Sequence, residues 1–205
     1  MDGLVLLGHL PVSSVPLVMF DPQYRSVLDR QAYGNEGDAR GRKRAELPQM
    51  ETECIKAFIA EIVRVLVPGG HLMLWVDKYI LCSGVTALTA GTPLHAVDMV
   101  TWDKLRMGMG YRTRRRCEHL VIFQLPPLRA KGVWQVHDIA DVWPERSQTG
   151  VGRHTHAKPL RLQQRLIEAV TSPGELVVDP AAGGFSVMTA ARAAGREFLG
   201  CDILG

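Results

Sequence analysis

The feature that most constrains this chain is the alternation of short apolar runs with segments of helical periodicity. Apolar side chains between residues 51 and 67 recur every three or four positions, which predicts an amphipathic helix. Further helices are predicted near 79–88, over 160–170 and over 185–194. The apolar runs predict buried strands at 4–7, 15–20, 71–76, 97–102, 120–125, 175–178 and 197–200. This alternation is typical of a Rossmann-like, doubly wound α/β sheet that is mostly parallel.

Length and composition fit one globular domain over residues 1–205, with 46% hydrophobic and 22% charged residues. No apolar run reaches the ~18 residues needed to span a membrane. The first residues lack the basic start of a secretory signal, so we expect a cytoplasmic protein without membrane association. The four cysteines form no CxxC pair, which argues against a zinc site or a disulfide framework; no metal site is predicted.

The net charge of +3 does not by itself indicate a nucleic-acid partner, but the basic residues are clustered. Clusters at 40–44, 112–116 and 153–158 could neutralise phosphates, although each could equally be solvated surface charge. The polar stretch at about 25–49 is too long for an ordinary connection, so a mobile basic loop is expected there. The candidate nucleic-acid contacts are Gln23, Arg40, Arg42, Lys43, Arg44, Arg114 and Arg115.

A Gly-rich turn directly after the predicted strand 175–178 suggests a cofactor pocket. An acid at a strand end, followed by small residues and then a helix, lets the backbone approach a ligand closely. Asp202 ends the next strand, where a carboxylate can bind both hydroxyls of a ribose. S-adenosylmethionine, NAD or a ligand-free turn all remain open, but the missing GxGxxG weakens a pyrophosphate site. The turn comprises Asp179, Pro180, Ala181, Ala182, Gly183 and Gly184, with Phe185 next.

A second acidic turn, Asp21-Pro22-Gln23-Tyr24, follows the predicted strand 15–20. The amino group of a nucleobase is a poor nucleophile because its lone pair is delocalised into the ring. The Asp21 carboxylate and the Pro22 carbonyl could accept its two hydrogens and so localise that lone pair. Proline stiffens the turn, and Tyr24 could stack on an extruded base. An ordinary Asp-Pro turn with a packing tyrosine is the alternative.

These motifs, in this order, resemble the β class of DNA amino-methyltransferases, in which the catalytic motif precedes the cofactor motif. Asp21-Pro22-Gln23-Tyr24 is similar to the family's Asp-Pro-Pro-Tyr, and Val178–Gly184 is similar to its Leu-Asp-Pro-Phe-Ala-Gly-Ser-Gly. The helix and Pro68-Gly69-Gly70 turn, the His154–Pro159 segment and Gly195–Asp202 complete the match, which spans nearly the whole chain.

The resemblance implies base flipping and direct methyl transfer from S-adenosylmethionine to double-stranded DNA. It implies that Asp21, Pro22 and Tyr24 hold the base, and that an acid at position 21 favours adenine N6. It places target recognition at about 126–153, where Trp134, His137, Asp141 and Trp143 could read bases, although packing is favoured for the tryptophans. The implied cofactor-binding residues are Asp179, Pro180, Ala181, Gly183, Gly184, Phe185 and Asp202, with help from His154 and Lys158.

Three departures from the family pattern stand out. Gln23 replaces the second proline, and the turn could therefore be looser or Gln23 could contact DNA. Ala181 and Phe185 replace the family's Phe and Gly, so Phe185 is expected to supply an aromatic wall for the cofactor. His9 follows Gly8 where the family has an Asp, which puts an adenine contact in doubt.

Several alternatives stay open at this point. The target could be cytosine N4, or adenine in RNA, although no additional RNA-binding element is evident. A NAD-dependent oxidoreductase leaves the Asp-Pro-Gln-Tyr turn unexplained, and a catalytically silent nucleic-acid-binding subunit leaves the three acids unexplained. A homodimer and a cognate restriction nuclease are both allowed, and the recognition sequence is not predicted.

Overall fold

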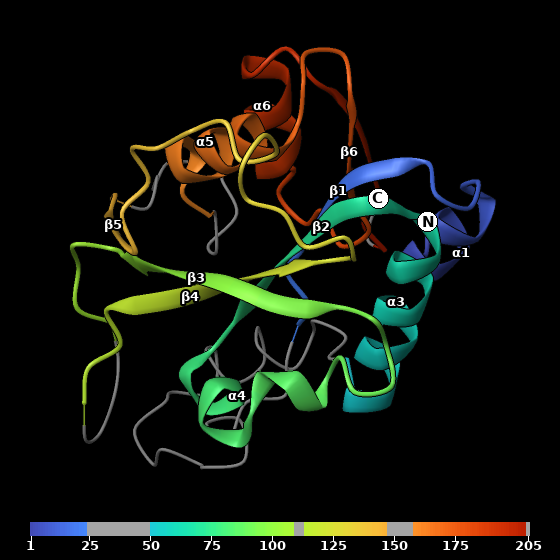
Figure 1. Cartoon of the computed structure of the whole chain (residues 1–205). Helices are drawn as coiled ribbons and strands as arrows, with labels where there is room; N and C mark the ends of the chain where they lie inside the picture. The colour runs from blue at the N-terminus through green and yellow to red at the C-terminus, as the bar shows by residue number, and fades with distance from the viewer. Residues whose placement is uncertain (24–49, 109–112, 147–157, 204–205) are drawn as a thin grey trace.

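A computed structural model describes residues 1–23, 50–108, 113–146 and 158–203. They form a seven-stranded sheet with the order β5-β3-β4-β2-β1-β6-β7 (Figure 1). β4 runs antiparallel to both of its neighbours, β2 and β3, whereas the other neighbouring pairs are parallel. The strands are β1 (Val15–Phe20), β2 (Leu66–Val76), β3 (His95–Asp103), β4 (Cys117–Gln124), β5 (Val142–Pro144), β6 (Leu176–Asp179) and β7 (Glu197–Gly200).

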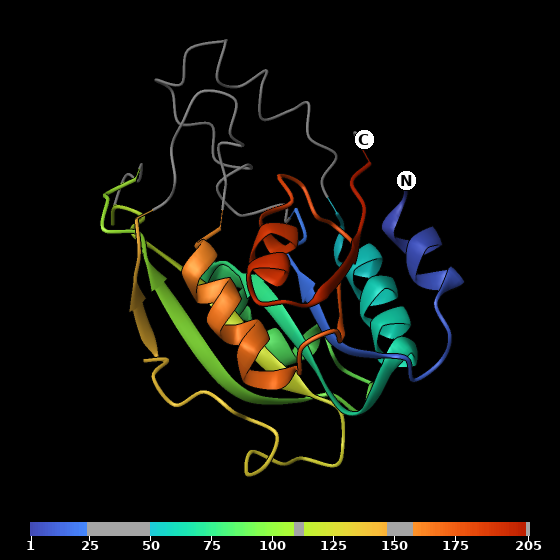
Figure 2. The same ribbon diagram turned by 90° about the horizontal axis from the view of Figure 1, so that it is seen from above.

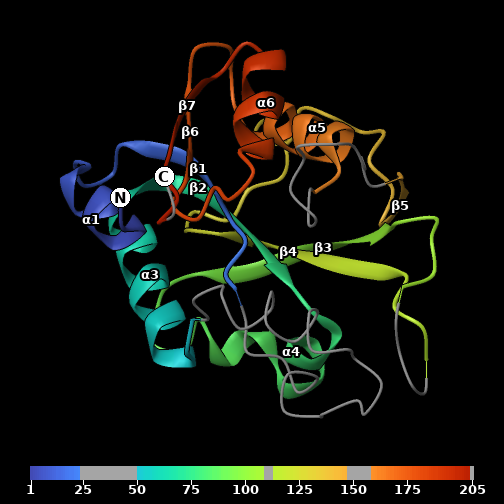
Figure 3. The same cartoon turned by 180° about the vertical axis from the view of Figure 1, so that it is seen from behind.

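Helices cover both faces of this sheet, as Figures 1 and 3 show from opposite sides. α5 and α6 pack on one face, whereas α3 packs on the other together with α1. Among the described residues, no helix combines the length and the apolar character that crossing a bilayer requires. The helices are α1 (Gly3–His9), α3 (Thr52–Val65), α4 (Lys78–Ser83), the 3-10 helix η1 (Val85–Ala87), α5 (Leu160–Val170) and α6 (Ser186–Ala193).

Two apolar cores lie on opposite sides of the sheet because successive side chains of a strand point to opposite faces. On β2, Met73 and Trp75 belong to the core under α5 and α6, whereas Leu72 and Leu74 belong to the core under α3. β2 is central, so both sets are buried and the strand is a near-continuous apolar run. The same alternation fixes which face each strand-end side chain occupies.

The prediction of a strand at residues 4–7 is wrong, because this segment lies in α1. Asp2 caps the helix, its Oδ1 accepting a hydrogen bond from the Leu4 N–H at 2.8 Å. Leu6 and Leu7 are buried, and α1 packs against α3 instead of joining the sheet. A short apolar run cannot be assigned to helix or strand by periodicity alone.

The mostly parallel, doubly wound α/β sheet is otherwise confirmed. The structure has α5 at the predicted residues 160–170, and β1 and β7 also match. The predicted helix at 79–88 is divided into α4 and η1, with Gly84 between them at φ 93°. The reversed direction of β4 could not be read from its apolar pattern, and it matters for the site.

Candidate active site

Acidic side chains gather at one edge of the sheet, where β1, β6 and β7 end. Asp21 follows β1, Asp179 is the last residue of β6, and Asp202 lies two residues after β7. β6 lies between β1 and β7, so the three carboxylates belong to adjacent strands. Asp21 and Asp179 also share the face covered by α5 and α6, because they continue the alternation of Met19 and Val177. The two acidic turns that follow predicted strands therefore lie at one edge of the sheet.

The turn after β6 is built from backbone contacts. Asp179 is only 3% exposed, and its Oδ1 accepts the Ala181 N–H at 3.1 Å. The Ala182 N–H donates to the Cys201 carbonyl at 2.9 Å, which ties the turn to the chain leaving β7. Gly183 has φ 47°, a left-handed conformation that glycine adopts without strain, and a Cβ added there would come no closer than 4.0 Å, to the Ala181 carbonyl oxygen. The turn thus offers a carboxyl group and an unobstructed backbone to a ligand.

Phe185, at the position where the family motif has a glycine, has a left-handed backbone conformation. Its φ of 54° lies in the left-handed region, which is uncommon and strained for a bulky residue. Its N–H donates to the Ala182 carbonyl at 2.7 Å, and its ring packs edge-on against Phe198 with centroids 6.3 Å apart. The ring is half-buried at the start of α6. This position next to the turn is compatible with the aromatic wall expected from the sequence, which stays a prediction.

Asp179 lies in surroundings that favour a cationic ligand. Burial raises the pKa of its carboxyl to about 8, and the nearby carboxylates of Asp21 and Asp202 add to the rise. The hydrogen bond from the Ala181 N–H and the Lys158 ammonium lower this pKa and offset part of the rise. A positively charged group beside Asp179 would favour the ionised form. S-adenosylmethionine carries a sulfonium and an ammonium group, and its ribose suits an acid in the position of Asp202. The residues present therefore fit this cofactor.

The amino-terminal residues contact the predicted cofactor turn and the chain after β7, which the sequence interpretation missed. The Met1 amino group donates to the Asp202 carbonyl at 3.0 Å, so Asp2 begins α1 at this same edge. Gly3 allows this approach, since a Cβ there would lie 2.1 Å from the Pro180 carbonyl oxygen. His9 instead lies at the far end of α1, with Nδ1 bonded to the Val5 carbonyl at 2.7 Å. The acid near the cofactor turn is Asp2, and reading 4–7 as a strand concealed it.

The carboxylate of Asp21 is paired with a lysine. Its Oδ2 lies 2.9 Å from Nζ of Lys158, which also lies 2.8 Å from Oε2 of Glu118. The other oxygen of Glu118 bonds to Lys104, and the Lys158 ammonium lies 5.0 Å from the ring centroid of Trp75. Asp21 is 33% exposed, whereas Lys158 is 13% exposed. Lys158, predicted among the cofactor residues, thus contacts the predicted catalytic acid directly.

The charges of this group stabilise one another. Burial alone would raise the pKa of Glu118, but the ammonium groups of Lys158 and Lys104 outweigh it and lower that pKa to about 2. Burial alone would lower the pKa of Lys158, but Asp21 and Glu118 outweigh it and raise that pKa above its ordinary value. Glu118 and Lys158 are therefore both charged at neutral pH.

Lys158 is positioned by a capped helix. It lies two residues before α5, and Glu145 accepts the Arg161 and Leu162 N–H groups at 3.1 Å each. The same carboxylate accepts the Trp143 indole N–H at 2.8 Å. At the other side, buried Gln163 bonds to Ser186, the first residue of α6. The starts of α5 and α6 are consequently fixed to each other and to β5.

The predicted recognition segment, 126–153, is described as far as residue 146. Trp134 and Trp143 are half-buried against the core under α5, so the packing interpretation of both is confirmed. Because β4 is antiparallel, the segment starts at the edge opposite Asp21, and the Gln135 N–H donates to the Ala169 carbonyl near the end of α5. In Figure 2 this yellow segment lies at the opposite end of the sheet from both termini. Exposed His137 and Asp141 as base readers stay a prediction.

The predicted DNA contacts are described only in part. Arg114 is exposed, with Nε donating to the Gly108 carbonyl at 2.6 Å, and Arg115 is half-buried; both lie between β3 and β4 at the edge that bears Glu118. Gln23 is exposed, and its carbonyl accepts the Met50 N–H at 2.8 Å, so the described chain breaks off and resumes beside the predicted catalytic turn. Tyr24, Arg40, Arg42, Lys43, Arg44 and His154 lie outside the described residues.

Comparison with known proteins agrees with this geometry. Residues 15–204 match the DNA methylase family of N6/N4 methyltransferases. The chain is 51% identical over 205 residues to the Type II methyltransferase M.HhaII of Haemophilus parahaemolyticus, covering 100% of this chain and 89% of that protein.

Solved structures share the fold. The M1.HpyAVI–SAM complex superposes with a TM-score of 0.70 at 16% identity, covering 98% of this chain and 90% of that one. The cytosine-N4-specific PvuII DNA methyltransferase gives a TM-score of 0.73 at 15% identity, with 98% and 79% covered. The chain belongs to the N6/N4 DNA methylase family and is an S-adenosylmethionine-dependent DNA methyltransferase.

Proposed function

We propose that this enzyme methylates N6 of a flipped adenine at a specific site in double-stranded DNA. The observation that carries the proposal is the placement of Asp21 beside the Asp179 turn, on the same face and edge of two adjacent strands. This arrangement brings an acceptor for amino hydrogens next to the residues that fit the cofactor. S-adenosylmethionine supplies the electrophilic methyl group when it is bound.

The residues of the Asp21 turn prepare the nucleophile. The Asp21 carboxylate and the Pro22 carbonyl accept the two hydrogens of the amino group, which localises the nitrogen lone pair and points it away from them. Pro22 is buried and fixes the backbone of the turn, so both acceptors are preorganised. Asp21 accepts the proton released after transfer, and Tyr24 stacks on the flipped base.

The choice of adenine rests on the acid at position 21. In the family that this chain resembles, an aspartate at that position favours adenine over cytosine. Cytosine N4 is the nearest alternative, because the family includes both specificities and the PvuII enzyme of the same fold is cytosine-N4-specific. The chemistry at Asp21 would be the same for either base.

The DNA contacts are proposed to surround the catalytic turn. Gln23 and Arg114 are exposed at the catalytic edge, and the segment that carries Arg40, Arg42, Lys43 and Arg44 leaves the described fold at Gln23 and returns at Met50. Arginines and lysines there, with Arg115, would neutralise phosphates on either side of the flipped base. His154 is proposed to assist the cofactor.

A role in restriction and modification is the biological context that we propose. It is supported by the similarity to M.HhaII, a Type II methyltransferase, over the whole of this chain. A cognate nuclease that recognises the same site would be the expected counterpart. A homodimer would supply a second recognition surface.

Mass spectrometry of nucleosides tests this function. Unmethylated DNA is incubated with the enzyme and S-adenosylmethionine, digested to nucleosides and compared with a reaction that contains Asp21→Ala. We expect N6-methyladenine with the wild type alone. N4-methylcytosine would overturn the adenine assignment, whereas methylation of RNA in a parallel reaction with no DNA product would overturn the DNA substrate.

A further inference from the structure

A chain of four charged side chains connects the catalytic carboxylate to the opposite half of the sheet. Asp21 follows β1, Lys158 precedes α5, Glu118 is the second residue of β4 and Lys104 follows β3. Lys158 bridges the two carboxylates at 2.9 and 2.8 Å, and Glu118 bonds to both lysines. The side chains of Lys104 and Glu118 are 25% and 27% exposed, so these four charged side chains are largely shielded from solvent.

We propose that Glu118 is a positioning residue for methyl transfer, which acts on the catalytic Asp21 carboxylate through the ammonium group of Lys158. The proposal rests on the role of Asp21 as the acceptor of the amino hydrogens. Glu118 itself is not placed to touch the base, because Lys158 lies between it and Asp21.

The first argument is geometric. A lysine side chain is a flexible four-carbon stem that ends in a point charge, so a single carboxylate does not fix its direction. Here the ammonium is held from three sides: by Asp21, by Glu118 and by the face of Trp75 at 5.0 Å. A carboxylate has about four lone-pair sites, so Asp21 can keep the bond to Lys158 and still accept from an amino group. Lys158 then fixes the orientation in which Asp21 meets the base.

The second argument concerns charge. Asp21 and Glu118 balance Lys158 and Lys104, so the group is neutral overall when all four are ionised. Without Glu118 the group would carry an excess positive charge next to a cationic cofactor. Lys158 would then pair with Asp21 alone and draw electron density from the oxygens that accept the amino hydrogens. Glu118 shares the ammonium and preserves the basicity of Asp21.

The third argument is the placement of Glu118 in the sheet. Glu118 lies on the same face as Leu120 and Ile122, which belong to the core under α5 and α6. Because β4 runs antiparallel to β2, the start of β4 lies at the edge where β1 and β6 end. In a wholly parallel sheet this position would lie at the opposite edge from Asp21. The first residues of β1 and β6 lie at the opposite edge of the sheet. The reversed direction of β4 therefore brings the Glu118 carboxylate, near the start of its strand, to the edge that bears Asp21.

A double-mutant cycle with Glu118→Gln and Lys158→Met tests the proposal. The rate of methyl transfer is measured in single turnovers, since product release can mask the chemical step. We expect Glu118→Gln to slow transfer about tenfold while the Kd for S-adenosylmethionine stays within about twofold. We expect no further loss when Glu118→Gln is added to Lys158→Met, because Glu118 acts only through Lys158.

A purely structural cross-link would behave differently. Because Glu118 and Lys158 are in contact, its losses would also be non-additive in the cycle, but the loss from Glu118→Gln would follow the Tm of the variant. An unchanged rate with Glu118→Gln, additive losses, or a loss of rate that follows the Tm overturns the proposal. If Glu118→Gln proves unstable, Lys104→Met provides the second measurement, since it removes one bond of Glu118 but keeps its bond to Lys158. A positioning role predicts a smaller loss of rate for Lys104→Met than for Lys158→Met, and an equal loss overturns it.

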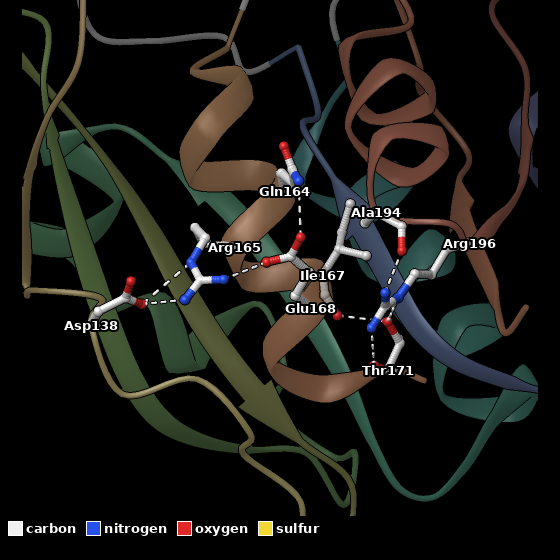
Figure 4. A network of polar contacts seen from close by, with 8 residues as sticks. All are labelled: Asp138, Gln164, Arg165, Ile167, Glu168, Thr171, Ala194 and Arg196. Atoms are coloured by element: carbon white, nitrogen blue, oxygen red, sulfur yellow. Dashed lines mark hydrogen bonds and ion pairs between the residues drawn. The ribbon is translucent and has the colours of Figure 1, made fainter. Parts of the chain in front are cut away.

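A matched control lies on the outer side of α5. Arg165 forms ion pairs of 2.6 Å with Asp138 and 2.5 Å with Glu168 (Figure 4). Arg165→Gln removes two ion pairs from the helix that follows Lys158 without touching Lys158, and it should leave the rate unchanged. Asp21→Asn is measured alongside: an active Asp21→Asn enzyme contradicts the proposed function itself, whereas an inactive one with wild-type Glu118→Gln activity contradicts only this inference.

Discussion

Asp21 and Asp179 end neighbouring strands of one sheet, yet their surroundings differ. Asp21 is 33% exposed and forms an ion pair with Lys158. Asp179 is 3% exposed, its Oδ1 accepts a backbone N–H, and in the part of the chain that the structure describes it forms no ion pair. The comparison suggests two uses for one residue type. The pairing of Asp21 with a cation suits an acid that is proposed to meet a neutral base, and the position of Asp179 among other acids suits a cationic cofactor.

The sharpest test of this division is Asp21→Ala. The variant should lose methyl transfer by about 10³-fold or more, because preorganised acceptors act where charge develops in the reaction. Its affinity for S-adenosylmethionine should be retained, because Asp21 is proposed to act on the base and not on the cofactor. Filter binding of labelled cofactor and transfer of the labelled methyl group to DNA measure the two properties separately. Loss of both in a folded variant would show that the two acids are not functionally separate.

The pH dependence of cofactor affinity tests the other side of the comparison. The raised pKa of Asp179, about 8, means that its carboxyl is mostly protonated at neutral pH before the cofactor binds. A cationic cofactor favours the carboxylate, so binding must release that proton at low pH. The Kd should therefore fall as pH rises, by about tenfold per unit below pH 8, and level off above it.

The matched control for this measurement is Asp179→Asn, which binds more weakly and lacks the titrating group. The amino group of the cofactor titrates near pH 8 as well, and it affects both proteins alike. The difference between the two pH profiles belongs to Asp179. Parallel profiles would remove Asp179 from the cofactor site or show that its pKa is not raised.

The strand-end acids could be predicted from the sequence because an apolar run followed by an acid and a turn is a local pattern. Asp21, Asp179 and Asp202 were found in this way, and so was the full extent of α5. Their neighbourhood follows from the strand order, which places β6 between β1 and β7. The edge and the face that these acids occupy can be predicted from the direction of each strand and from the alternation of side chains along it.

Other parts of the site depend on long-range pairing that no local pattern contains. Glu118 reaches the site because β4 is antiparallel, and an apolar strand reads the same in either direction. Glu145 caps α5 from the end of β5, a strand of three residues that the sequence did not indicate. Asp2 was missed because α1 was read as a strand. Each omission involves a contact between segments far apart in the chain or a run too short to classify.

The last expected effect is a gain of stability in Asp179→Asn without cofactor. A carboxyl whose pKa is about 8 when folded but near 3.9 when unfolded holds its proton more tightly in the folded state. The unfolded wild type therefore binds fewer protons over this range, and its stability falls as pH rises from about 4 to about 8. Asparagine lacks this proton, so the Tm advantage of Asp179→Asn should grow across that window and become constant above pH 8. For a domain of this size each kcal/mol shifts Tm by about 2–4 °C, and thermal unfolding at pH 5, 7 and 9 measures the trend.

The same substitution at Asp21 should instead destabilise the free protein, because it leaves the Lys158 ammonium with one carboxylate fewer. Opposite signs for the two substitutions would establish that one acid is stabilised by the fold and the other is kept at a cost for the cofactor, whereas equal signs would contradict the contrast between them.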